Sequence, residues 1–209
     1  MSFYNIDNQS RRDRILHAAL KLFHSKGFFK TSVHEIREQA DVSIGLVYRY
    51  FKNKEEIAQT VYSELLQETM ATMETIISET PSARECSKAI ITLYLQMTEN
   101  YPEIVDFVIF ARHREIMPEG EPICAKGPPE LIRAMVKQGM KNGEIRSMNL
   151  AVAAASIFGS TIRLIQLRLA GMVDAPLPSL RDEIFETAWN SVANCENSSL
   201  ILPIRDCPT

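Results

Sequence analysis

The stretch between residues 27 and 53 constrains this chain more than any other segment, because two short helical patterns flank a tight turn there. Ser32 and Glu35 have the spacing of a capping box, which predicts a helix of about two turns beginning just after Ser32. The sequence Asp41-Val42-Ser43 interrupts that pattern, and either Asp41 or Ser43 can cap a third short helix. This order of helix, tight turn and helix is that of a helix-turn-helix unit.

A longer amphipathic helix is predicted immediately before this unit, from Arg11 to about Ser25. Its apolar side chains recur at the three- and four-residue spacing of one helix face, namely Ile15, Leu16, Ala19, Leu22 and Phe23. Gly27 fits the position just beyond its end, where glycine is favoured. In the third helix, Val47 is expected to face the core. Residues 1–54 are therefore predicted to form a three-helix head.

Charge is distributed unevenly between this head and the rest of the chain. The whole chain carries a formal net charge of -3. Residues 1–54 hold ten basic and five acidic side chains, a net charge of +5, whereas the remainder holds thirteen and twenty-one, a net charge of −8. A basic head on an acidic body is the layout expected when only the head meets phosphate.

The rest of the chain is predicted to be all-α. A long helix begins near Lys54 and runs towards Ile77, connecting the head to a helical body at residues 55–196. Further helical segments are predicted at 84–99, 103–116, 129–141, 149–171 and 179–195, separated by Pro- and Gly-containing breaks. Residues 197–209 form a C-terminal tail whose placement the sequence does not decide.

Several functional classes find no support in the sequence. The first ten residues lack the apolar region of a signal peptide, and no apolar run reaches the length that a membrane span requires, so we expect a cytoplasmic protein without a membrane partner. Four cysteines, at positions 86, 124, 195 and 207, have neither metal-binding nor disulfide-framework spacing. His17, His24 and His34 are expected on the surface and not at ligand spacing, so no metal and no cofactor are predicted.

An enzyme is also disfavoured, because the chain has no phosphate-binding glycine loop, no HExxH sequence and no suggestive nucleophile-base pair. A protein-interaction module that retains the head's fold without binding DNA is an alternative of similar weight. Its support is the pair of apolar side chains Ile44 and Leu46 on the expected reading face.

Residues 27–57 closely resemble the head of the tetracycline-repressor (TetR) family. The resemblance covers about a quarter of the chain and includes a Gly-aromatic-x-x-Thr lead at Gly27, a Val-Ser-x-Gly turn, a Tyr-x-Tyr-Phe segment and a Lys-Glu-Glu start of the connector. Arg37 and Asp41 depart from the family pattern, which usually has a small alanine and a glycine there. The resemblance implies a dimeric transcriptional repressor that leaves a palindromic operator in double-stranded DNA when a small effector binds the body.

The candidate DNA-binding residues are Thr31, Ser43, Ile44, Gly45, Leu46, Tyr48, Arg49, Tyr50 and Lys54. Ser43 and Arg49 are the polar groups available to read bases, whereas Ile44 and Leu46 are limited to apolar contact with thymine methyl groups. By resemblance, phosphates would be held by Thr31, Tyr48, Tyr50 and Lys54. Arg11, Arg12 and Arg14 are further candidates for contact with the DNA backbone. The competing interpretation makes the aromatic residues core side chains of the head, and for Phe51 that interpretation is favoured.

The body is expected to supply both a dimer interface and an effector site. Residues 149–171 are rich in small side chains, and the last helix carries an apolar stripe formed by Ile184, Phe185, Ala188, Trp189 and Val192. The resemblance places these two helices in the homodimer, although an intramolecular core is the alternative. Candidate effector contacts, for a lipophilic or acidic molecule, are Tyr94, Met97, Phe110, His113, Arg163 and Gln166. Plain core packing or surface ion pairs are the competing interpretations for these residues.

Overall fold

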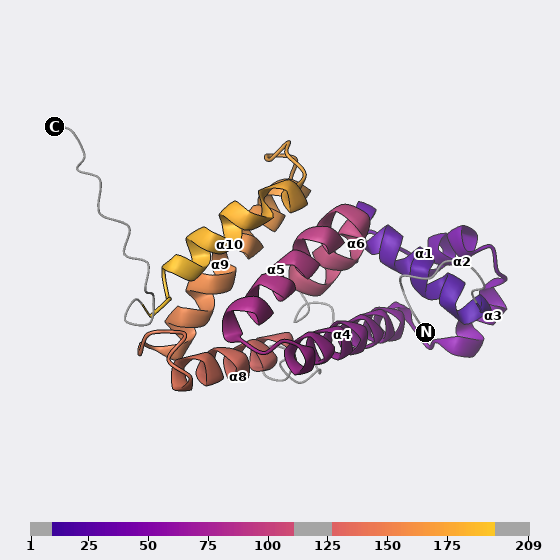
Figure 1. Ribbon diagram of the computed structural model, residues 1–209. Coiled ribbons are helices and arrows are strands. Elements are labelled where there is room, and N and C mark those ends of the chain that lie inside the picture. Colours follow the sequence, from indigo (N-terminus) through magenta and orange to yellow (C-terminus); the bar gives the residue numbers. More distant parts are fainter. Residues whose placement is uncertain (1–9, 111–126, 195–209) are drawn as a thin grey trace.

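The computed structural model describes residues 10–110 and 127–194, and within them the chain is built from helices. The head comprises α1 (Arg11–Lys26), α2 (Val33–Ala40) and α3 (Ile44–Tyr50), which form one end of an elongated molecule (Figure 1). Helix α4 (Lys54–Glu79) leaves the head and runs along the body. The predicted boundary between residues 54 and 55 thus falls at the start of one continuous helix.

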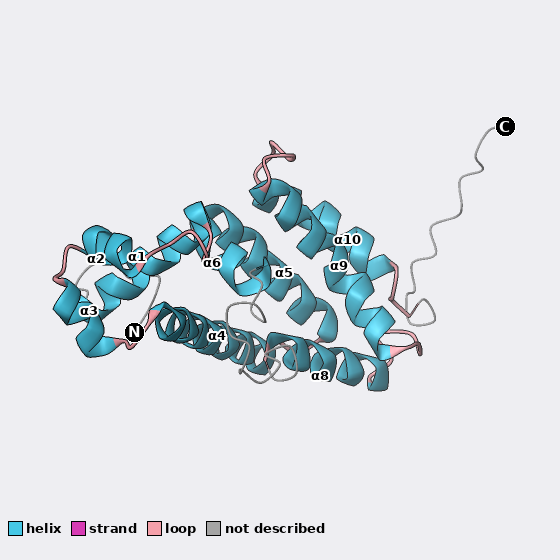
Figure 2. Ribbon diagram, turned by 180° about the vertical axis from the view of Figure 1, so that it is seen from behind, coloured by secondary structure: helices cyan, strands magenta, loops and turns pink. Residues whose placement is uncertain are grey.

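The body packs around α4 and the long helix α5 (Ala83–Asn100), which Figure 2 shows from behind. A short helix, α6 (Pro102–Val105), continues directly into the π-helical turn η1 (Asp106–Phe110), and both contact α1 of the head. Helix α8 (Pro128–Lys141) lies beside the far end of α4. The remaining elements are α9 (Leu150–Leu169), the 3₁₀ turn η2 (Leu177–Leu180) and α10 (Arg181–Asn190).

Local capping confirms the predicted helix starts in the head. Ser32 and Glu35 form the expected reciprocal capping box at the start of α2. Ser10 and Asp13 form another at the start of α1, and Ser43 caps α3 by accepting the Leu46 N–H. Each helix start is therefore determined by hydrogen bonds between residues three apart in the sequence.

Two predicted body helices differ from the structure. The segment expected as one helix at 103–116 is instead α6 followed by the wider η1 turn, and residues 111–116 lie outside the described part. The last helix ends at Asn190 and not at 195. After it, the chain pairs with the segment that follows α8, since the Arg146 N–H donates to the Val192 carbonyl at 2.9 Å.

Helix α9 is long and apolar enough to cross a membrane by length and composition alone, with a mean hydropathy of 1.6 in its best window. This finding departs from the prediction that no segment reaches such a length, because Arg163 and Arg168 interrupt the apolar run without lowering its mean hydropathy enough. Only 28% of that window is buried inside the chain. Because α9 packs against α5, α8 and α10 on one side, its unburied apolar surface lies on the other.

The apolar stripe of α10 does not face outward as the predicted dimer interface requires. Phe185 and Val192 are fully buried, and Ile184, Ala188 and Trp189 are nearly so. These side chains pack against α5 and α9 within the same chain. The alternative of an intramolecular core is therefore correct for α10.

Candidate DNA-binding surface and effector groove

The turn between α2 and α3 depends on Asp41, which adopts a left-handed backbone conformation with φ 51°. Glycine adopts this conformation with the least strain, and aspartate is one of the few other residues that enter it. Aspartate can therefore replace the usual glycine without breaking the turn. The Arg14 guanidinium donates to the Ala40 carbonyl at 2.5 Å and to the Asp41 carbonyl at 2.9 Å. Arg14 therefore caps the end of α2 and is directed into the head, not towards DNA.

Helix α3 presents an exposed outward face. Gly45, Tyr48, Arg49 and Tyr50 are exposed, whereas Val47 is completely buried, as predicted. The exposed fraction is 54% for Tyr48 and 43% for Tyr50, which argues against both as core aromatics. Phe51 is buried, in agreement with its assignment to the core. The structure thus brings the predicted polar readers Ser43 and Arg49 to one end of the molecule.

Ile44 and Leu46 are only half-buried on this helix. Part of each side chain is therefore available for contact with another molecule. An added Cβ at Gly45, between them, would meet nothing within 4 Å. The surface at Gly45 is therefore open to the close approach of another molecule, as the sequence predicted for DNA.

Thr31 does not fit its predicted role as a phosphate ligand. Its side chain is buried, with an exposed fraction of 2%. Its hydroxyl donates to the Gly27 carbonyl at 2.9 Å, close to the Leu22 carbonyl at 3.3 Å. The hydroxyl faces inward because the turn after α1 leaves carbonyl groups that need a donor. We therefore assign Thr31 to the stability of the head.

Lys54 also has a structural role that the sequence did not suggest. Its ammonium donates to the carbonyls of Phe28 and Thr31, each at 2.8 Å, and lies 4.3 Å from the centroid of the Phe28 ring. These contacts fasten the start of α4 to the loop between α1 and α2. An ammonium has three N–H groups, so one remains for a phosphate.

Other cations of the head also serve its internal structure. The Arg12 guanidinium donates to Glu64 of α4 at 2.6 Å. The Lys26 ammonium, hydrogen-bonded at 2.6 Å, together with the Ser32 N–H and hydroxyl, lowers the pKa of Glu35 to about 2. Glu35 consequently stays ionised and holds the start of α2. Fewer cations of the head are therefore available to DNA than its net charge suggests. Arg12, like Arg14, forms hydrogen bonds within the protein.

Two of the candidate effector residues lie between α4 and α5. Tyr94 is buried with its hydroxyl 3.7 Å from the Met73 sulfur, and Met97 is buried one turn further along α5. Met97 lines a hollow of about 300 Å³, together with Thr69, Thr72, Leu93, Gln96, Asn100 and Tyr101. Sequence reasoning missed these polar neighbours, because only the packing of α4 against α5 brings them together.

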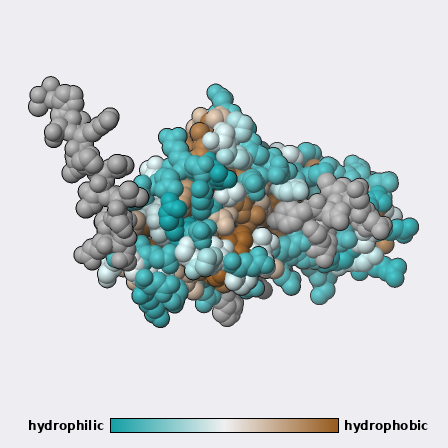
Figure 3. All heavy atoms as spheres, viewed as in Figure 1, coloured by the Kyte–Doolittle hydropathy of each residue, from teal (hydrophilic) through white to brown (hydrophobic). Residues whose placement is uncertain are grey.

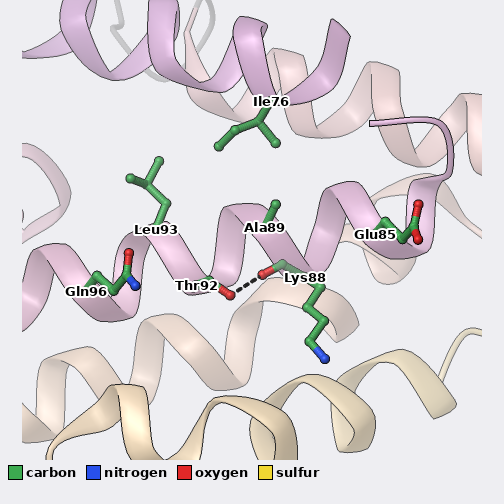
Figure 4. Close-up of a pocket in the computed structure, with 7 residues that line it drawn as sticks. All are labelled: Ile76, Glu85, Lys88, Ala89, Thr92, Leu93 and Gln96. Carbon is green, nitrogen blue, oxygen red and sulfur yellow. Dashed lines mark hydrogen bonds between the residues drawn. The ribbon is translucent and has the colours of Figure 1, made fainter. Parts of the chain in front are cut away.

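A second hollow, of about 480 Å³, adjoins the first through Leu93 and Gln96. Figure 4 shows Ala89 and Leu93 pointing across it towards Ile76 of α4, whereas Lys88 extends away towards α10. We call the two hollows together the α4–α5 groove. Figure 3 shows apolar residues gathered near the middle of the molecule in this view, between α4 and α5.

The other candidate effector residues do not join this groove. Arg163 and Gln166 are exposed on the outward side of α9, where the guanidinium donates to the Gln166 amide oxygen at 2.6 Å. They pair with each other because they lie one helical turn apart. Phe110 is half-buried against the core at the end of η1, and His113 lies outside the described residues. Within the described part of the chain, Arg163 and Gln166 are therefore not brought to the groove that Met97 lines.

The described histidines have surroundings that the sequence did not reveal. His34 is exposed, but His17 is half-buried on α1, and burial is the main cause that lowers its pKa. His24 Nδ1 contacts Asp106 Oδ2 of η1 at 2.8 Å. No group of metal-binding side chains occurs among the residues that the structure describes.

Comparison with known proteins identifies the head. Residues 15–61 match the sequence model of the bacterial regulatory proteins of the tetR family. The helix-turn-helix head is therefore a TetR-family head. The chain is 23% identical over 185 residues to the fatty acid metabolism regulator protein of Bacillus subtilis, covering 87% of this chain and 95% of that protein. The relatives are transcriptional regulators and not enzymes, in agreement with the sequence.

Solved structures share the fold along most of the chain. The regulator FadR from Bacillus subtilis, solved in complex with stearoyl-CoA, has a TM-score of 0.72 at 22% identity, over 84% of this chain and 96% of that one. FadR from Bacillus halodurans has a TM-score of 0.75 at 17% identity, over 88% and 96%. A helical body behind a helix-turn-helix head is thus shared with both.

Proposed function

We propose that this protein is a dimeric repressor that binds a palindromic operator and leaves it when a small lipophilic or acidic effector binds the body. The observation that carries the DNA-binding part is the outward face of α3. There Tyr48, Arg49 and Tyr50 are exposed around an open Gly45, and Arg49 has no ion-pair partner in the described part of the chain. A helix that presents such groups at the end of an elongated molecule suits the major groove.

The outward face of α9 supports the homodimer. Val152, Ala155 and Gly159 are exposed in the single chain and share one side of the helix, and a Cβ added at Gly159 would meet nothing. An apolar helix with this little burial is stabilised when a second copy covers it. Two heads held by one such interface would match the two half-sites of a palindrome.

The α4–α5 groove supports an effector site in the body. Its walls belong partly to α4, the helix that starts at the head. An effector bound in the groove would therefore change the position of α4 and, through it, of the head. Tyr101 lines the groove and also begins α6, accepting the Ile104 N–H at 3.0 Å. A groove with apolar side chains such as Ile76 and Leu93 at its middle and polar groups towards both ends suits an acyl chain with a polar head.

We take acyl thioesters as the first effector class to test, since one structural neighbour was solved with stearoyl-CoA. We place the protein in the cytoplasm, because its relatives regulate transcription. Helix α9 packs on one side against three other helices, and the proposal covers its other side with the second copy.

DNA binding is tested by retardation of a duplex taken from upstream of the protein's own coding sequence, at low salt. Tyr48→Phe and Arg49→Ala should weaken binding, the latter by about tenfold if Arg49 contacts a base. Lys137→Ala is the matched control, because it removes an exposed cation from α8 in the body. Wild-type protein that retards no duplex, or an Arg49→Ala variant that binds like the control, would contradict the proposal.

The effector proposal is tested by adding stearoyl-CoA and the free fatty acid to the DNA complex. Either ligand should release the DNA and raise the melting temperature of the free protein. Ala89→Trp fills the groove and should abolish both effects, whereas Ala134→Trp, at an exposed position of α8, should not. Release that survives Ala89→Trp would place the effector elsewhere.

A further inference from the structure

The head is attached to the body at a second place besides α4. His24, in the last turn of α1, and Asp106, in the first turn of η1, are 82 positions apart in sequence, yet their side chains meet at 2.8 Å. Asp106 can only accept when ionised, so the His24 Nδ1–H donates. Both side chains are a little over one third exposed.

An aromatic contact lies directly beside this hydrogen bond. The rings of Phe23 and Phe107 are stacked, with centroids 5.9 Å apart and planes inclined by 18°. Both side chains are buried, and Phe107 also contacts Tyr62 of α4 with ring centroids 6.4 Å apart. Phe107 therefore contacts both α1 of the head and α4, the helix that leaves the head.

The aromatic contacts continue towards the DNA-binding surface. Phe23 packs on Phe28 with ring centroids 5.3 Å apart, and the Lys54 ammonium lies over the Phe28 ring. The end of α1, the loop before α2 and the start of α4 are thus one packed unit. The contacts of Asp106 with His24 and of Phe107 with Phe23 therefore hold the orientation of that unit relative to the body.

Residues 106 and 107 occupy an unusual backbone. They begin a π-helical turn that follows only four residues of α-helix. Isolated π turns of this kind occur mostly where a helix has been widened by one residue to aim particular side chains, and often at functional sites. Here the widened turn directs two consecutive side chains to α1.

We propose that Asp106 and Phe107, although they lie in the body, are positioning residues for DNA binding, because they hold the end of α1 through His24 and Phe23. The proposal rests on the DNA binding argued above. Without the contacts of Asp106 and Phe107 the head is joined to the body only through α4 and the packing of α6 on α1, and its extra freedom must be lost when it docks on DNA. Affinity then falls although no phosphate or base contact has been removed.

The test measures DNA affinity by fluorescence anisotropy across a series of salt concentrations, with a duplex selected by the wild-type protein from a random library. Asp106→Ala and His24→Ala should each weaken binding by about two- to fivefold, the range expected for one exposed ionic contact. The double variant should be no weaker than either single variant, since both remove the same contact. Phe107→Leu should weaken binding further, and Asp106→Glu should restore it.

Two controls separate positioning from loss of folding and from loss of phosphate contacts. Glu186→Ala removes a similarly exposed ion pair, with Arg84, that joins α5 to α10 away from the head, and it should leave affinity unchanged. All variants should stay folded at the assay temperature, and the slope of log affinity against log salt should equal that of the wild type.

The result that overturns the inference is an Asp106→Ala variant that binds like Glu186→Ala, or two single effects that multiply in the double variant. A reduced salt slope would also overturn it, because it would mean a lost phosphate contact. Wild-type protein that binds no duplex would overturn the proposed function and this inference together, so the two failures are distinguishable.

Discussion

Gly139 of α8 and Ala83 of α5 pack so closely that a Cβ added at Gly139 would lie 2.6 Å from the Ala83 Cβ. The same added atom would lie 2.9 Å from the end of the Ile145 side chain. Gly139 is itself buried. The start of α5 and the end of α8 therefore touch almost backbone to backbone, which fixes where α8 sits beside α4 and α5.

Gly139→Ala should accordingly destabilise the protein by about 1–3 kcal/mol, as overpacking does. The sign opposes helix propensity, which alone favours alanine over glycine by about 1 kcal/mol. Urea unfolding followed by circular dichroism measures the change. Ala83→Gly in the same chain should recover part of the loss, whereas a loss that persists undiminished would show that Ala83 is not the obstacle.

The Glu99 carboxylate joins three elements of the body. It accepts from the Arg168 guanidinium at 2.9 and 3.0 Å and from the Leu177 N–H at 3.1 Å. These bonds link the end of α5 to the end of α9 and to η2. Glu99→Gln should lower the free energy of unfolding at pH 7 by about 1–3 kcal/mol, because a charge-assisted pair is broken at a partly buried position.

The effect of Glu99→Gln should also depend on pH. The hydrogen bonds from Arg168 lower the pKa of Glu99 below its ordinary value, with the Leu177 N–H assisting. A carboxyl whose pKa is lowered on folding contributes stability that is fully present above the unfolded pKa, about 4.3, and is lost as pH falls through the folded pKa. The difference between wild type and variant should therefore shrink below about pH 4. A difference that stays constant from pH 7 to pH 3 would contradict this account.

Thr31→Val tests the reassignment of Thr31 from DNA contact to head stability. Valine has the same shape but cannot donate to the Gly27 carbonyl, so stability should fall by about 1 kcal/mol. The salt dependence of DNA binding should not change, because no phosphate contact is lost. Thr60→Val is a control in which the hydroxyl bonds only to the preceding turn of α4 and a smaller effect is expected. A reduced salt slope for Thr31→Val would restore its role as a phosphate ligand.

Ala155→Glu tests the proposed use of α9 as the dimer interface. The position is exposed in the single chain, so the fold should tolerate glutamate, but a charge buried between two copies should dissociate them. Sedimentation equilibrium should show a monomer for this variant. Ala71→Glu, at an exposed position of α4, should remain a dimer. A dimeric Ala155→Glu protein would move the interface to another face.

The head could be predicted closely because its structure depends on neighbours in the sequence. The capping box of Ser32 and Glu35, the cap of Ser43 and the inward position of Val47 all follow from contacts within one or two helical turns. The long helix after Asn53 was predicted for the same reason. In the described part of the body, the sequence predicted only the approximate positions of the long helices.

The direction in which side chains point was the main source of error. Arg163 and Gln166 seemed suited to an effector site, but rotation of α9 about its axis carries them outward. The stripe of α10 seemed suited to a dimer, but α5 and α9 cover it within the chain. Periodicity identifies an apolar face and does not say which partner will cover it.

The sequence alone determined the helix-turn-helix head with its TetR-family pattern, and the contrast between a basic head and an acidic remainder, because capping, turns and charge are properties of neighbouring residues. Only the tertiary structure showed that the side chains of Thr31, Arg14 and Lys54 donate hydrogen bonds to backbone carbonyls within the head. It alone brought His24 to Asp106. Such contacts join residues far apart in the chain, and their partners are selected by packing, which no local pattern encodes.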